Sequence, residues 1–321
     1  MKISNGVRPR ILIFSIAYEP LLGGAELAVR KITDRLSSYD FNLITCRFNL
    51  AHKSREKIGN VTVYRVGFGT RLGKLLYPAF AYLQAKKLQL SNPYQVVWSI
   101  MAAYAGAASL MFLRRFPAVK FLLMLQEGDA PAHIHRRVRG FKKQWQRVFK
   151  RANAISAISN FLAAWARAEG ATCPIAVVPN GVEIEKFKSQ NSKVKIANQN
   201  AKVVITVSRL VPKNGVDILI RAMAVIASSD ASVGAKQSLA DRHVRLRRTR
   251  DDIKLQILGA GPDERKLKKL AGDLQVTDIV EFKGEISPET VPQFLQEADI
   301  FVRPSRSEGL GSAFLEAMAA G

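Results

Sequence analysis

Cysteine is nearly absent from this sequence, which contains only Cys46 and Cys173 in 321 residues. The two lie far apart and neither belongs to a CxxC pair, so a disulfide framework and a structural zinc site are both disfavoured. So few thiols, without metal-ligand spacing, are typical of a protein from a reducing compartment. We therefore predict that both cysteines are reduced.

Long hydrophobic runs are also scarce. The first one, Ile11–Tyr18, is short, is followed at once by Glu19 and has no small-residue cleavage site, so it does not fit a signal peptide. The segment Val96–Leu113 is uncharged over 18 residues, which just reaches the lower limit for a membrane span. Its many Ala, Gly and Ser residues instead predict a strand, Val96–Ile100, followed by a small-residue helix.

Acidic residues are few relative to basic ones. The chain has 26 Asp+Glu against 49 Lys+Arg, which gives a formal net charge of +23. A charge of this size predicts attraction to nucleic acid, to an anionic lipid surface or to phosphate-rich substrates. Composition alone leaves all three open.

Part of this charge lies in one segment, Arg136–Ala152, with eight Lys/Arg residues and no acid. Apolar residues recur there every three or four positions, which predicts a helix with one apolar and one basic face. Two interpretations stay open: a helix packed on its own domain, or a helix that lies on an anionic bilayer. The apolar residues are Val138, Phe141, Trp145, Val148 and Ala152.

Short apolar runs alternate with helical patterns along the whole chain. Such runs between helices predict parallel strands covered on both faces. We expect strands of a first domain at 11–16, 42–48, 61–67, 96–100, 119–125, 154–159 and 175–180, and strands of a second at 203–208, 253–259, 279–284 and 299–305. The predicted fold class is α/β, with two Rossmann-like doubly wound domains, 1–188 and 189–321.

Two stretches interrupt this alternation. Residues 188–202 are polar and contain almost no core-forming residues, which predicts a linker. The basic stretch between Ala227 and Ile253 is long for a helix-to-strand connection, so we expect an exposed insertion there.

Ligands of open α/β sheets bind beyond the carboxyl ends of the strands, so the residues that follow each strand are candidates for a site. After the first strand, Gly23–Gly24 would let a ligand approach the backbone and a helix N-terminus, although an ordinary turn also explains the pair. After the strand at 203–208, Arg209 and Lys213 flank a loop before a helix. Two cations there suit an anionic ligand, although solvated surface charge gives the same pattern.

The stretch SEGLGSAFLEAMAAG places Glu308 on a loop and Glu316 in a helix. We expect Ser312 to cap this helix, Glu316 to lie in its first turn, and Gly309 and Gly311 to leave backbone amides open to a phosphate. Carboxylates are poor phosphate ligands but good partners for hydroxyl groups. The pattern therefore fits a nucleotide-sugar, although stabilisation of the helix dipole alone would explain Glu316.

Five motifs follow one another along the chain: GGAE, VPNGVEIEKF, VSRLVPKNG, LGAGPDERKL and SEGLGSAFLEAMAAG. In this order they resemble the retaining glycosyltransferases of family 4, over nearly the whole chain. The Asn180–Gly181 turn and the Glu308/Glu316 pair are the most telling members. The resemblance implies a GT-B fold and transfer of a hexose from a nucleotide-diphosphate sugar to a glycan or lipid-linked acceptor in cell-envelope polysaccharide or glycolipid synthesis.

The resemblance also implies roles for single residues. Glu308 would contact the donor sugar's hydroxyls, Glu316 the nucleotide ribose, and Arg209 with Lys213 the diphosphate. Many members carry the diphosphate lysine directly before the glycine, where this chain has Asn214, so stabilisation of the leaving group would rest more on Arg209. The other implied donor-binding residues are Gly23, Gly24, Asn180, Gly259, Gly261, Ser287, Gly309, Leu310, Gly311 and Ser312.

A second departure from the family pattern follows the strand at 119–125. Numerous relatives carry a histidine there, near the reacting carbon, whereas this chain has Gln126. We expect Gln126, Glu127 and Asp129 to contact donor or acceptor, none of them as a base. No DxD motif occurs, which agrees with the metal-independent, cofactor-free mechanism that the resemblance implies, with cations and a helix dipole in place of magnesium.

The expected partners are the nucleotide-sugar, the glycan or lipid-linked acceptor, and an anionic membrane surface that contacts Arg136–Arg151; nucleic acid is not expected. The expected location is the cytoplasm, peripheral at the inner face of the cytoplasmic membrane. Family 4 sequences run on from EAMAAG into further strands and a C-terminal helix. The chain therefore resembles an enzyme truncated at its C-terminus, which predicts an incomplete second domain and loss of activity.

Three alternatives stay open. The first is a fragment that only binds nucleotide or anionic surfaces. The second is a GT-B sugar-nucleotide epimerase, which the glutamate pair and VPNGVEIEKF disfavour. The third is a basic nucleic-acid-binding protein, for which the sequence has neither aromatic stacking platforms nor a recognised motif. The donor is also open, with GDP-mannose and the UDP-hexoses all compatible.

Overall fold

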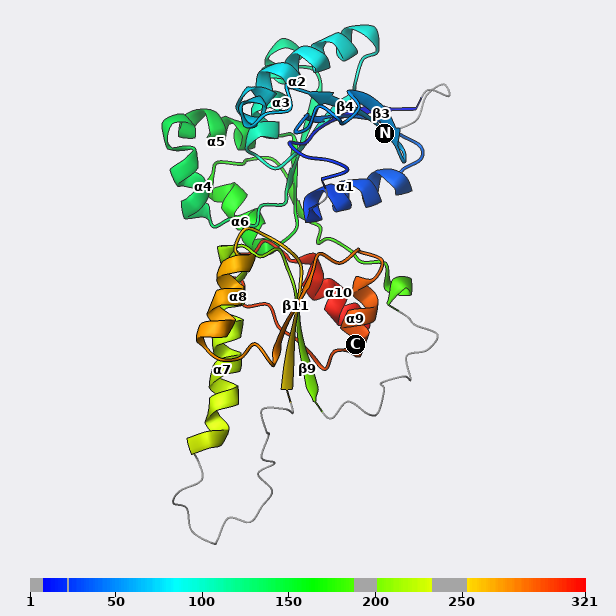
Figure 1. Cartoon of the computed structure of the whole chain (residues 1–321). Coiled ribbons are helices and arrows are strands. Elements are labelled where there is room, and N and C mark those ends of the chain that lie inside the picture. The colour runs from blue at the N-terminus through cyan, green and yellow to red at the C-terminus, as the bar shows by residue number, and fades with distance from the viewer. Residues whose placement is uncertain (1–7, 22, 188–200, 233–252) are drawn as a thin grey trace. The chain divides into compact units, whose positions relative to one another are not determined.

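The computed structural model describes residues 8–21, 23–187, 201–232 and 253–321. The chain divides into two compact units, Met1–Asn180 and Gly181–Gly321 (Figure 1). Most of the expected linker and the expected insertion after Ala227 lie outside the described residues. Within the described ranges, no helix is long and apolar enough to cross a membrane.

The N-terminal unit is built on an eight-stranded sheet in the order β3-β4-β2-β1-β5-β6-β7-β8. All seven strands predicted for this domain are present and parallel, although the last two end before the expected 159 and 180. They are β1 (Arg10–Phe14), β2 (Asp40–Cys46), β4 (Val61–Val66), β5 (Val96–Ile100), β6 (Lys120–Leu125), β7 (Ala154–Ala157) and β8 (Ile175–Val177). The sequence pattern missed β3 (Arg55–Ile58), an antiparallel edge strand of mainly polar residues.

Helices connect these strands, and the segment Val96–Leu113 splits into β5 and a helix as predicted. The helices are α1 (Gly24–Arg35), α2 (Arg71–Ser91), α3 (Tyr104–Arg115), α4 (Pro131–Arg137), α5 (Lys142–Arg151) and α6 (Asn160–Ala168). Helix α3 packs against both α2 and α5, so these three form one layer on the sheet. The strands are apolar on both sides because they are buried on both sides, as Leu12, Ile13 and Phe14 of β1 show with no exposed surface. Cys46 and Cys173 are both free.

The prediction of one continuous helix over Arg136–Ala152 is wrong. The segment forms the end of α4, a short 3₁₀ turn, η1 (Arg139–Phe141), and α5. Gly140 lies at the break, and glycine in a helix interior costs roughly 1 kcal/mol relative to alanine. Trp145 and Val148 are buried as expected, but Phe141 is 71% exposed.

The C-terminal unit has a parallel four-stranded sheet in the order β11-β10-β9-β12. All four predicted strands exist, as β9 (Lys202–Val207), β10 (Ile253–Leu258), β11 (Val280–Gly284) and β12 (Ile300–Phe301). The last was predicted over 299–305 and is much shorter. Pro304 has no N–H to donate to a ladder, so the strand cannot continue through it.

Helices cover both faces of this sheet. Residues of α7 (Val216–Ser232) and α8 (Glu264–Asp273) pack with β9 and β10 in one core cluster, around Leu255 and Ile257. Residues of α9 (Val291–Glu297) and α10 (Ser312–Ala320) pack in a second cluster on the other face, around Ile205 and Leu258. Figure 1 shows the two pairs on opposite sides of the sheet. Two short 3₁₀ turns, η2 (Ile184–Lys186) and η3 (Pro212–Asn214), complete the unit.

Candidate active site

The carboxyl ends of β9, β10, β11 and β12 meet at one edge of the C-terminal sheet because all four strands are parallel. The loops that leave this edge carry Arg209 after β9, Gly259 after β10, Ser287 after β11 and Glu308 after β12. Parallel topology thus gathers predicted donor-binding residues that lie far apart in the sequence. This is the edge at which open α/β sheets bind ligands.

The loops after β9 and β10 pack directly on one another. Leu210 N donates to Ala260 O at 3.0 Å, and Asp263 N donates to Leu210 O at 3.1 Å. A methyl group on Gly259 (φ +128°) would lie 2.0 Å from Ser208 O, and one on Gly261 would lie 2.4 Å from Leu210 O. These two glycines therefore have a packing reason of their own, and their contact with the donor's base stays a prediction.

Asn214, which stands where the family resemblance implies a lysine, faces inward. Its side chain is 3% exposed, and its Nδ2 donates to Arg209 O at 2.7 Å. Gly215 follows with φ +69°, and a methyl group there would lie 2.0 Å from Pro304 O. Asn214 thus fixes the backbone of the predicted diphosphate arginine instead of supplying a charge.

Arg303 is a residue that the sequence pattern missed. Its Nη2 lies 2.7 Å from Glu308 Oε2 and 3.4 Å from Asn214 Oδ1, and its Nε donates to Ser305 Oγ at 3.2 Å. The side chains of Arg303 and Glu308 are 12% and 24% exposed, so the ion pair is well shielded from water. The sequence feature that could have identified Arg303 is a basic residue directly after a strand, in VRPSRSEG.

A second arginine ties the same loop to η3. Arg306 donates to both carboxylate oxygens of Asp217, at 2.9 and 2.7 Å, and to Pro212 O at 2.5 Å. Hydrogen bonding to Arg306 lowers the pKa of Asp217 from its ordinary value. Arg306 N also donates to Lys213 O at 2.7 Å, so the backbone of the predicted diphosphate lysine is held against the loop that carries Glu308.

Two details predicted for α10 are wrong. Gly311 is the N-cap and Ser312 is the first helical residue, with no side-chain capping bond. Glu316 is consequently the fifth residue of the helix and lies beyond its first turn. A methyl group on Gly311 would lie 3.0 Å from Arg303 Nη1 and 3.2 Å from Glu308 Oε2. The glycine therefore leaves room for the ion pair at the start of α10.

The remaining predicted residues of this unit lie around the same edge. Gly309 N donates to Glu308 Oε1 at 3.3 Å, and Leu310 is partly buried just before the helix. Ser287 is exposed in the turn before α9, with its Oγ 3.0 Å from Thr290 Oγ1. Their roles toward a donor stay predictions.

In the N-terminal unit, Gly23 and Gly24 begin α1 as expected. Gly23 is the N-cap, and its N–H donates to the buried Glu26 carboxylate at 2.9 Å. Burial raises the pKa of Glu26 from its ordinary value. A side chain on Gly23 would collide with Glu26, since a methyl group there would lie 2.7 Å from Oε2. This gives the first glycine a structural role in addition to any ligand contact.

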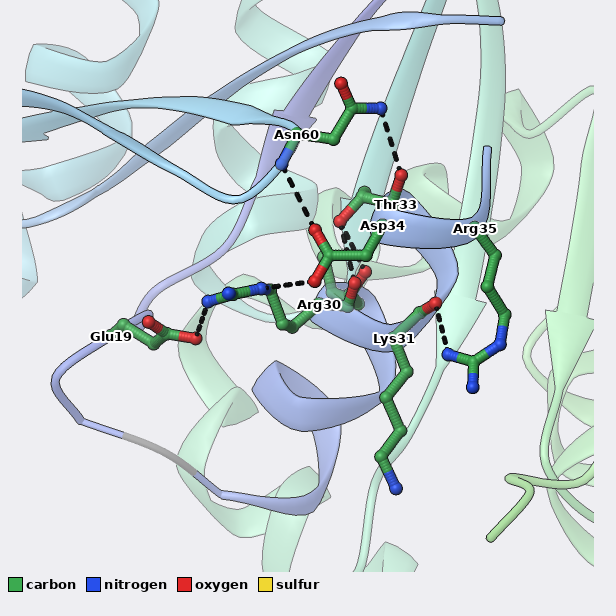
Figure 2. Close-up of polar contacts among 8 residues, drawn as sticks. Glu19, Arg30, Lys31, Thr33, Asp34, Arg35 and Asn60 are labelled. Atoms are coloured by element: carbon green, nitrogen blue, oxygen red, sulfur yellow. Dashed lines mark hydrogen bonds and ion pairs between the residues drawn. The ribbon is translucent and has the colours of Figure 1, made fainter. Parts of the chain in front are cut away.

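A polar network holds the loop between β1 and Gly23. Figure 2 shows Arg30 between two carboxylates: it pairs with Glu19 of the loop and, at 2.5 Å, with Asp34 one helical turn on. Asn60 N donates to Asp34 Oδ1 at 3.1 Å from the turn between β3 and β4. The buried Arg65 of β4 donates to Glu19 O. The loop that leads to the glycine pair is therefore anchored to α1 and to the sheet.

Gln126 and Asn180, both predicted site residues, lie against one another. Gln126 Nε2 donates to Asn180 Oδ1 at 3.0 Å, and Asn180 Nδ2 donates to Gln126 Oε1 at 2.9 Å. This reciprocal pair joins the carboxyl end of β6 to the end of the N-terminal unit. The two bonds fix the orientation of both carboxamides.

Glu127 lies beside this pair, and its carboxylate bridges two loops. Oε1 accepts from Ala102 N at 2.8 Å, in the loop after β5, and Oε2 accepts from Gln126 N at 3.0 Å. Burial raises the pKa of Glu127 to about 7, against the opposing effect of these backbone donors. Asp129, the third predicted residue of this loop, lies 3.8 Å from Arg137.

The HIH segment after this loop is structural. His135 Nε2 lies 2.5 Å from Glu169 Oε1, and Gln146 Nε2 donates to Glu169 Oε2 at 3.1 Å. Glu169 is 4% exposed, so these two partners satisfy a buried carboxylate. Among the described residues, no group of three or more His, Cys, Asp or Glu could hold a metal ion.

Two family models together match nearly the whole chain. The model described as Glycosyltransferase Family 4 matches residues 22–186, and the model described as Glycosyl transferases group 1 matches residues 187–321. A solved structure of HepE from Anabaena in complex with UDP-glucose superposes with a TM-score of 0.69 at 20% identity, over 97% of this chain and 78% of that one. The fold is GT-B, with two Rossmann-like domains, as predicted.

Curated relatives are similar over parts of their length. A GDP-mannose-dependent alpha-(1-6)-phosphatidylinositol monomannoside mannosyltransferase from Mycolicibacterium smegmatis is 30% identical over 189 residues, which are 55% of this chain and 44% of that protein. The amylovoran biosynthesis glycosyltransferase AmsK from Erwinia amylovora is 27% identical over 277 residues, which are 83% of this chain and 60% of that protein. The matched stretch thus spans less than half of the first relative.

Proposed function

This chain belongs to glycosyltransferase family 4, and on that premise we propose that it is a retaining glycosyltransferase acting on a nucleotide-diphosphate sugar. The acceptor is a glycan or a lipid-linked glycan of cell-envelope polysaccharide or glycolipid synthesis. Two relatives support this acceptor class, since one is named for a phosphatidylinositol mannoside and the other for amylovoran. The UDP-glucose complex of HepE supports a nucleotide-sugar donor.

The observation that carries the proposal is the series of contacts from Arg209 through Asn214 and Arg303 to Glu308. A departing nucleoside diphosphate gains negative charge, and the sugar that it leaves gains positive charge. Fixed cations stabilise the first, and a nearby carboxylate stabilises the second and accepts hydrogen bonds from hydroxyls. The loops after β9 and β12 offer both kinds of group within one hydrogen-bonded unit.

We assign roles on this basis. Arg209, with Lys213, binds the diphosphate, and the backbone amides of 309–312 lie along it. Glu308 contacts the sugar's hydroxyls, and Glu316 contacts the ribose. Residues 189–321 form the donor domain, residues 1–188 form the acceptor-side domain, and Gln126 contributes from the latter.

These residues stabilise the negative charge of the leaving diphosphate and the positive charge of the sugar without a metal. Asn214 holds the backbone carbonyl of Arg209, and the exposed guanidinium can turn toward a phosphate. Arg303 pairs with Glu308 at 2.7 Å, so it holds that carboxylate in a fixed orientation. For a retaining GT-B enzyme, the leaving phosphate then takes the acceptor's proton on the same face, as the family resemblance implies.

The test is a panel of nucleotide-sugars, GDP-mannose and UDP-hexoses among them, against the full chain in a thermal-shift assay. A nucleotide-sugar that stabilises the chain is then offered with and without lipid-linked acceptors. Sugar transfer supports the proposal. Conversion of UDP-N-acetylglucosamine without acceptor would make the chain an epimerase, binding without turnover would make it a binding fragment, and DNA that displaces the nucleotide-sugar would favour a nucleic-acid-binding protein.

We also propose that the chain works at the inner face of the cytoplasmic membrane, with the basic segment Arg136–Arg151 against anionic headgroups. Each basic residue near such a surface contributes about 1 kcal/mol. Replacement of Arg136, Arg137, Lys142 and Lys143 by Gln should abolish co-sedimentation with anionic vesicles at low salt. If this variant pellets as the parent does, the segment serves another purpose.

A further inference from the structure

Lys74 of α2 lies against the first residue of α3. Its ammonium group is 5.3 Å from the centroid of the Tyr104 ring. Lys74 is near the start of α2, which follows β4, and Tyr104 begins α3, which follows β5. Both strands belong to the parallel part of one sheet, and Figure 1 shows α2 and α3 side by side. The N-terminal ends of the two helices therefore lie close together at the carboxyl edge of the N-terminal sheet.

The start of α2 is packed on the end of β2, which holds Lys74 at this edge. A methyl group on Gly73 would lie 4.0 Å from Cys46 Sγ, in the last residue of β2. Burial raises the pKa of the Cys46 thiol, and the positive charge of Lys74 opposes this increase. The ammonium group is thus near the carboxyl end of β2 as well as the Tyr104 ring.

A helix N-terminus is an unfavourable place for a cation. The backbone dipoles make this end of a helix positive, so basic residues are favoured at C-terminal ends, where α3 carries Arg114 and Arg115. Neither α2 nor α3 has an acidic residue in its first turn. Lys74 therefore adds its charge to two helix ends that are already positive, and an anion bound there would be stabilised by all three.

The acidic residues in the surrounding sequence are engaged elsewhere. From Val61 to Ala168 the only ones are Glu127 and Asp129. Glu127 accepts backbone amides on both carboxylate oxygens, and one of these amides is Ala102 N in the loop before α3. Asp129 lies 3.8 Å from Arg137. This part of the chain thus has little acidic charge to set against Lys74.

The two helix ends also offer hydrogen-bond donors. The N-cap of α3 is Ala103, which makes no side-chain bond to the first amides of the helix, and these amides have no partner within it. Ala103 is exposed and Tyr104 is half-buried, so a ligand can reach them. The N-cap of α2 is the exposed Thr70, whose hydroxyl accepts from Gly73 N at 3.4 Å and keeps its own proton for a ligand.

We infer that Lys74, Tyr104 and the first amides of α3 bind a phosphate group of the acceptor. An ammonium group and helix N-terminal amides both bind phosphate well, and the Tyr104 hydroxyl adds a donor. The bond from Ala102 to Glu127 joins this place to the loop that carries Gln126, the residue proposed to act from the acceptor-side domain. The inference rests on the proposed function only for the word acceptor. It narrows the acceptor to one with a phosphate, either on its glycan or on its lipid.

The test is a calorimetric titration of the full chain with mannose 1-phosphate and with geranyl phosphate, which carry the phosphate on a sugar and on a lipid. Mannose, geraniol and glucuronate are the comparison compounds without phosphate. Lys74→Met removes the charge and keeps a long side chain against the Tyr104 ring. Lys86→Met is the matched control, because Lys86 is an exposed residue of the same helix. Tyr104→Phe keeps the ring and removes the hydroxyl.

Parent and Lys86→Met should bind at least one of the two phosphates, and the one bound more tightly identifies the carrier of the phosphate. Lys74→Met should bind it at least roughly tenfold more weakly, as for loss of a hydrogen bond to a charged group, and Tyr104→Phe should bind it severalfold more weakly. Equal affinities of Lys74→Met and Lys86→Met would overturn the inference. So would a parent that binds neither phosphate, or one that binds glucuronate equally well.

The donor site is tested separately with Arg209→Ala. If this variant loses the phosphate compound while Lys74→Met keeps it, the phosphate occupies the proposed donor site and the inference is wrong. Lys74→Met should bind a nucleotide-sugar as the parent does, because Lys74 belongs to the N-terminal unit. A parent that binds the phosphate compound through Lys74 but no nucleotide-sugar would contradict the proposed function and leave the phosphate site standing.

A variant that stabilises the fold separates loss of binding from loss of structure. Ala103→Asp places a carboxylate at the N-cap of α3, where it can accept from the first amides and complement the helix dipole. Its Tm should rise, and its phosphate binding should fall at least as far as that of Lys74→Met, because the carboxylate takes the place of the phosphate. Ala79→Asp adds the same charge at an exposed position inside α2 and should do neither. An Ala103→Asp variant with a raised Tm and the parent's phosphate affinity would contradict the inference.

Discussion

Arg303 Nη2 lies 2.7 Å from Glu308 Oε2 and 3.4 Å from Asn214 Oδ1, so one side chain links the loop after β12 to η3 after β9. Asn214 in turn donates to the carbonyl of Arg209 at 2.7 Å. The contacts run without a break from the proposed sugar carboxylate to the proposed diphosphate cation. A change at Arg303 should therefore weaken the contacts to both the diphosphate and the sugar of the donor, and the contact to the sugar more strongly.

Arg303→Lys should weaken nucleotide-sugar binding more than nucleoside-diphosphate binding. An ammonium keeps the charge but cannot reach Glu308, Asn214 and Ser305 together. We expect a loss of roughly 1.5–3 kcal/mol for the nucleotide-sugar, as for a hydrogen bond to a charged group. Calorimetric titration of both ligands measures the difference. If Arg303 acts through Glu308, adding Glu308→Gln to Arg303→Lys should cost little more than the worse single change, and additive losses would contradict the link.

Arg209→Ala should weaken binding of the nucleoside diphosphate itself by roughly 1.5–3 kcal/mol, since a charged hydrogen bond is lost. Binding of the corresponding monophosphate should change less. Arg221→Ala removes an exposed arginine from α7 and serves as the control for net charge. Unchanged diphosphate affinity in Arg209→Ala, measured by the same titration, would rule out this residue as the diphosphate cation.

Gly259→Ala should destabilise the C-terminal unit. The residue has φ +128°, and the new methyl group would lie 2.0 Å from Ser208 O, a backbone atom. Strain from such a backbone angle alone costs on the order of 1–3 kcal/mol. Gly272→Ala is the matched control, because nothing lies within 4 Å of a methyl group at that position in α8. Thermal unfolding should show a lower Tm for the first variant and an equal or higher Tm for the second.

The strands could be predicted because burial on both faces of a parallel sheet makes each one a continuous apolar run, as in Val96–Ile100. β3 could not, since Arg55–Ile58 is an edge strand whose polar residues face solvent. The predicted length of β12 was wrong because the prediction carried the apolar run of Ile300, Phe301 and Val302 on to residue 305, whereas Pro304 has no N–H for a ladder. The prediction of a continuous helix over 136–152 was wrong because it followed the apolar periodicity and gave too little weight to Gly140, which disfavours a helix interior.

The sequence was sufficient to predict which loops after strands carry the candidate site residues. Arg209, Gly259 and Glu308 each follow a strand, and parallel topology brings such positions together. Pairings across the edge were not predictable, because the contact between Asn214 and Arg303 depends on β9 and β12 being neighbours in the sheet. The cap of α10 was assigned to Ser312 from residue type, whereas Gly311 holds that position because the space beside Arg303 and Glu308 is too narrow for a longer side chain.

Glu127→Gln should flatten the dependence of stability on pH. Burial raises the pKa of Glu127 from 4.5 to about 7 in the folded chain. Between these values the folded state holds a proton that the unfolded state has released, so stability falls as pH rises through this window and levels off above about pH 7. The contribution is on the order of 3 kcal/mol at most. Gln cannot ionise, so Tm of the variant should fall less than that of the parent between about pH 5 and about pH 8. Glu281→Gln, which removes an exposed carboxylate from β11, controls for loss of a charge and should follow the parent. A parent whose Tm rises across the window, or a Glu127→Gln variant with the parent's slope, would mean that Glu127 is ionised in the fold at low pH and that its bonds from Ala102 and Gln126 outweigh its burial.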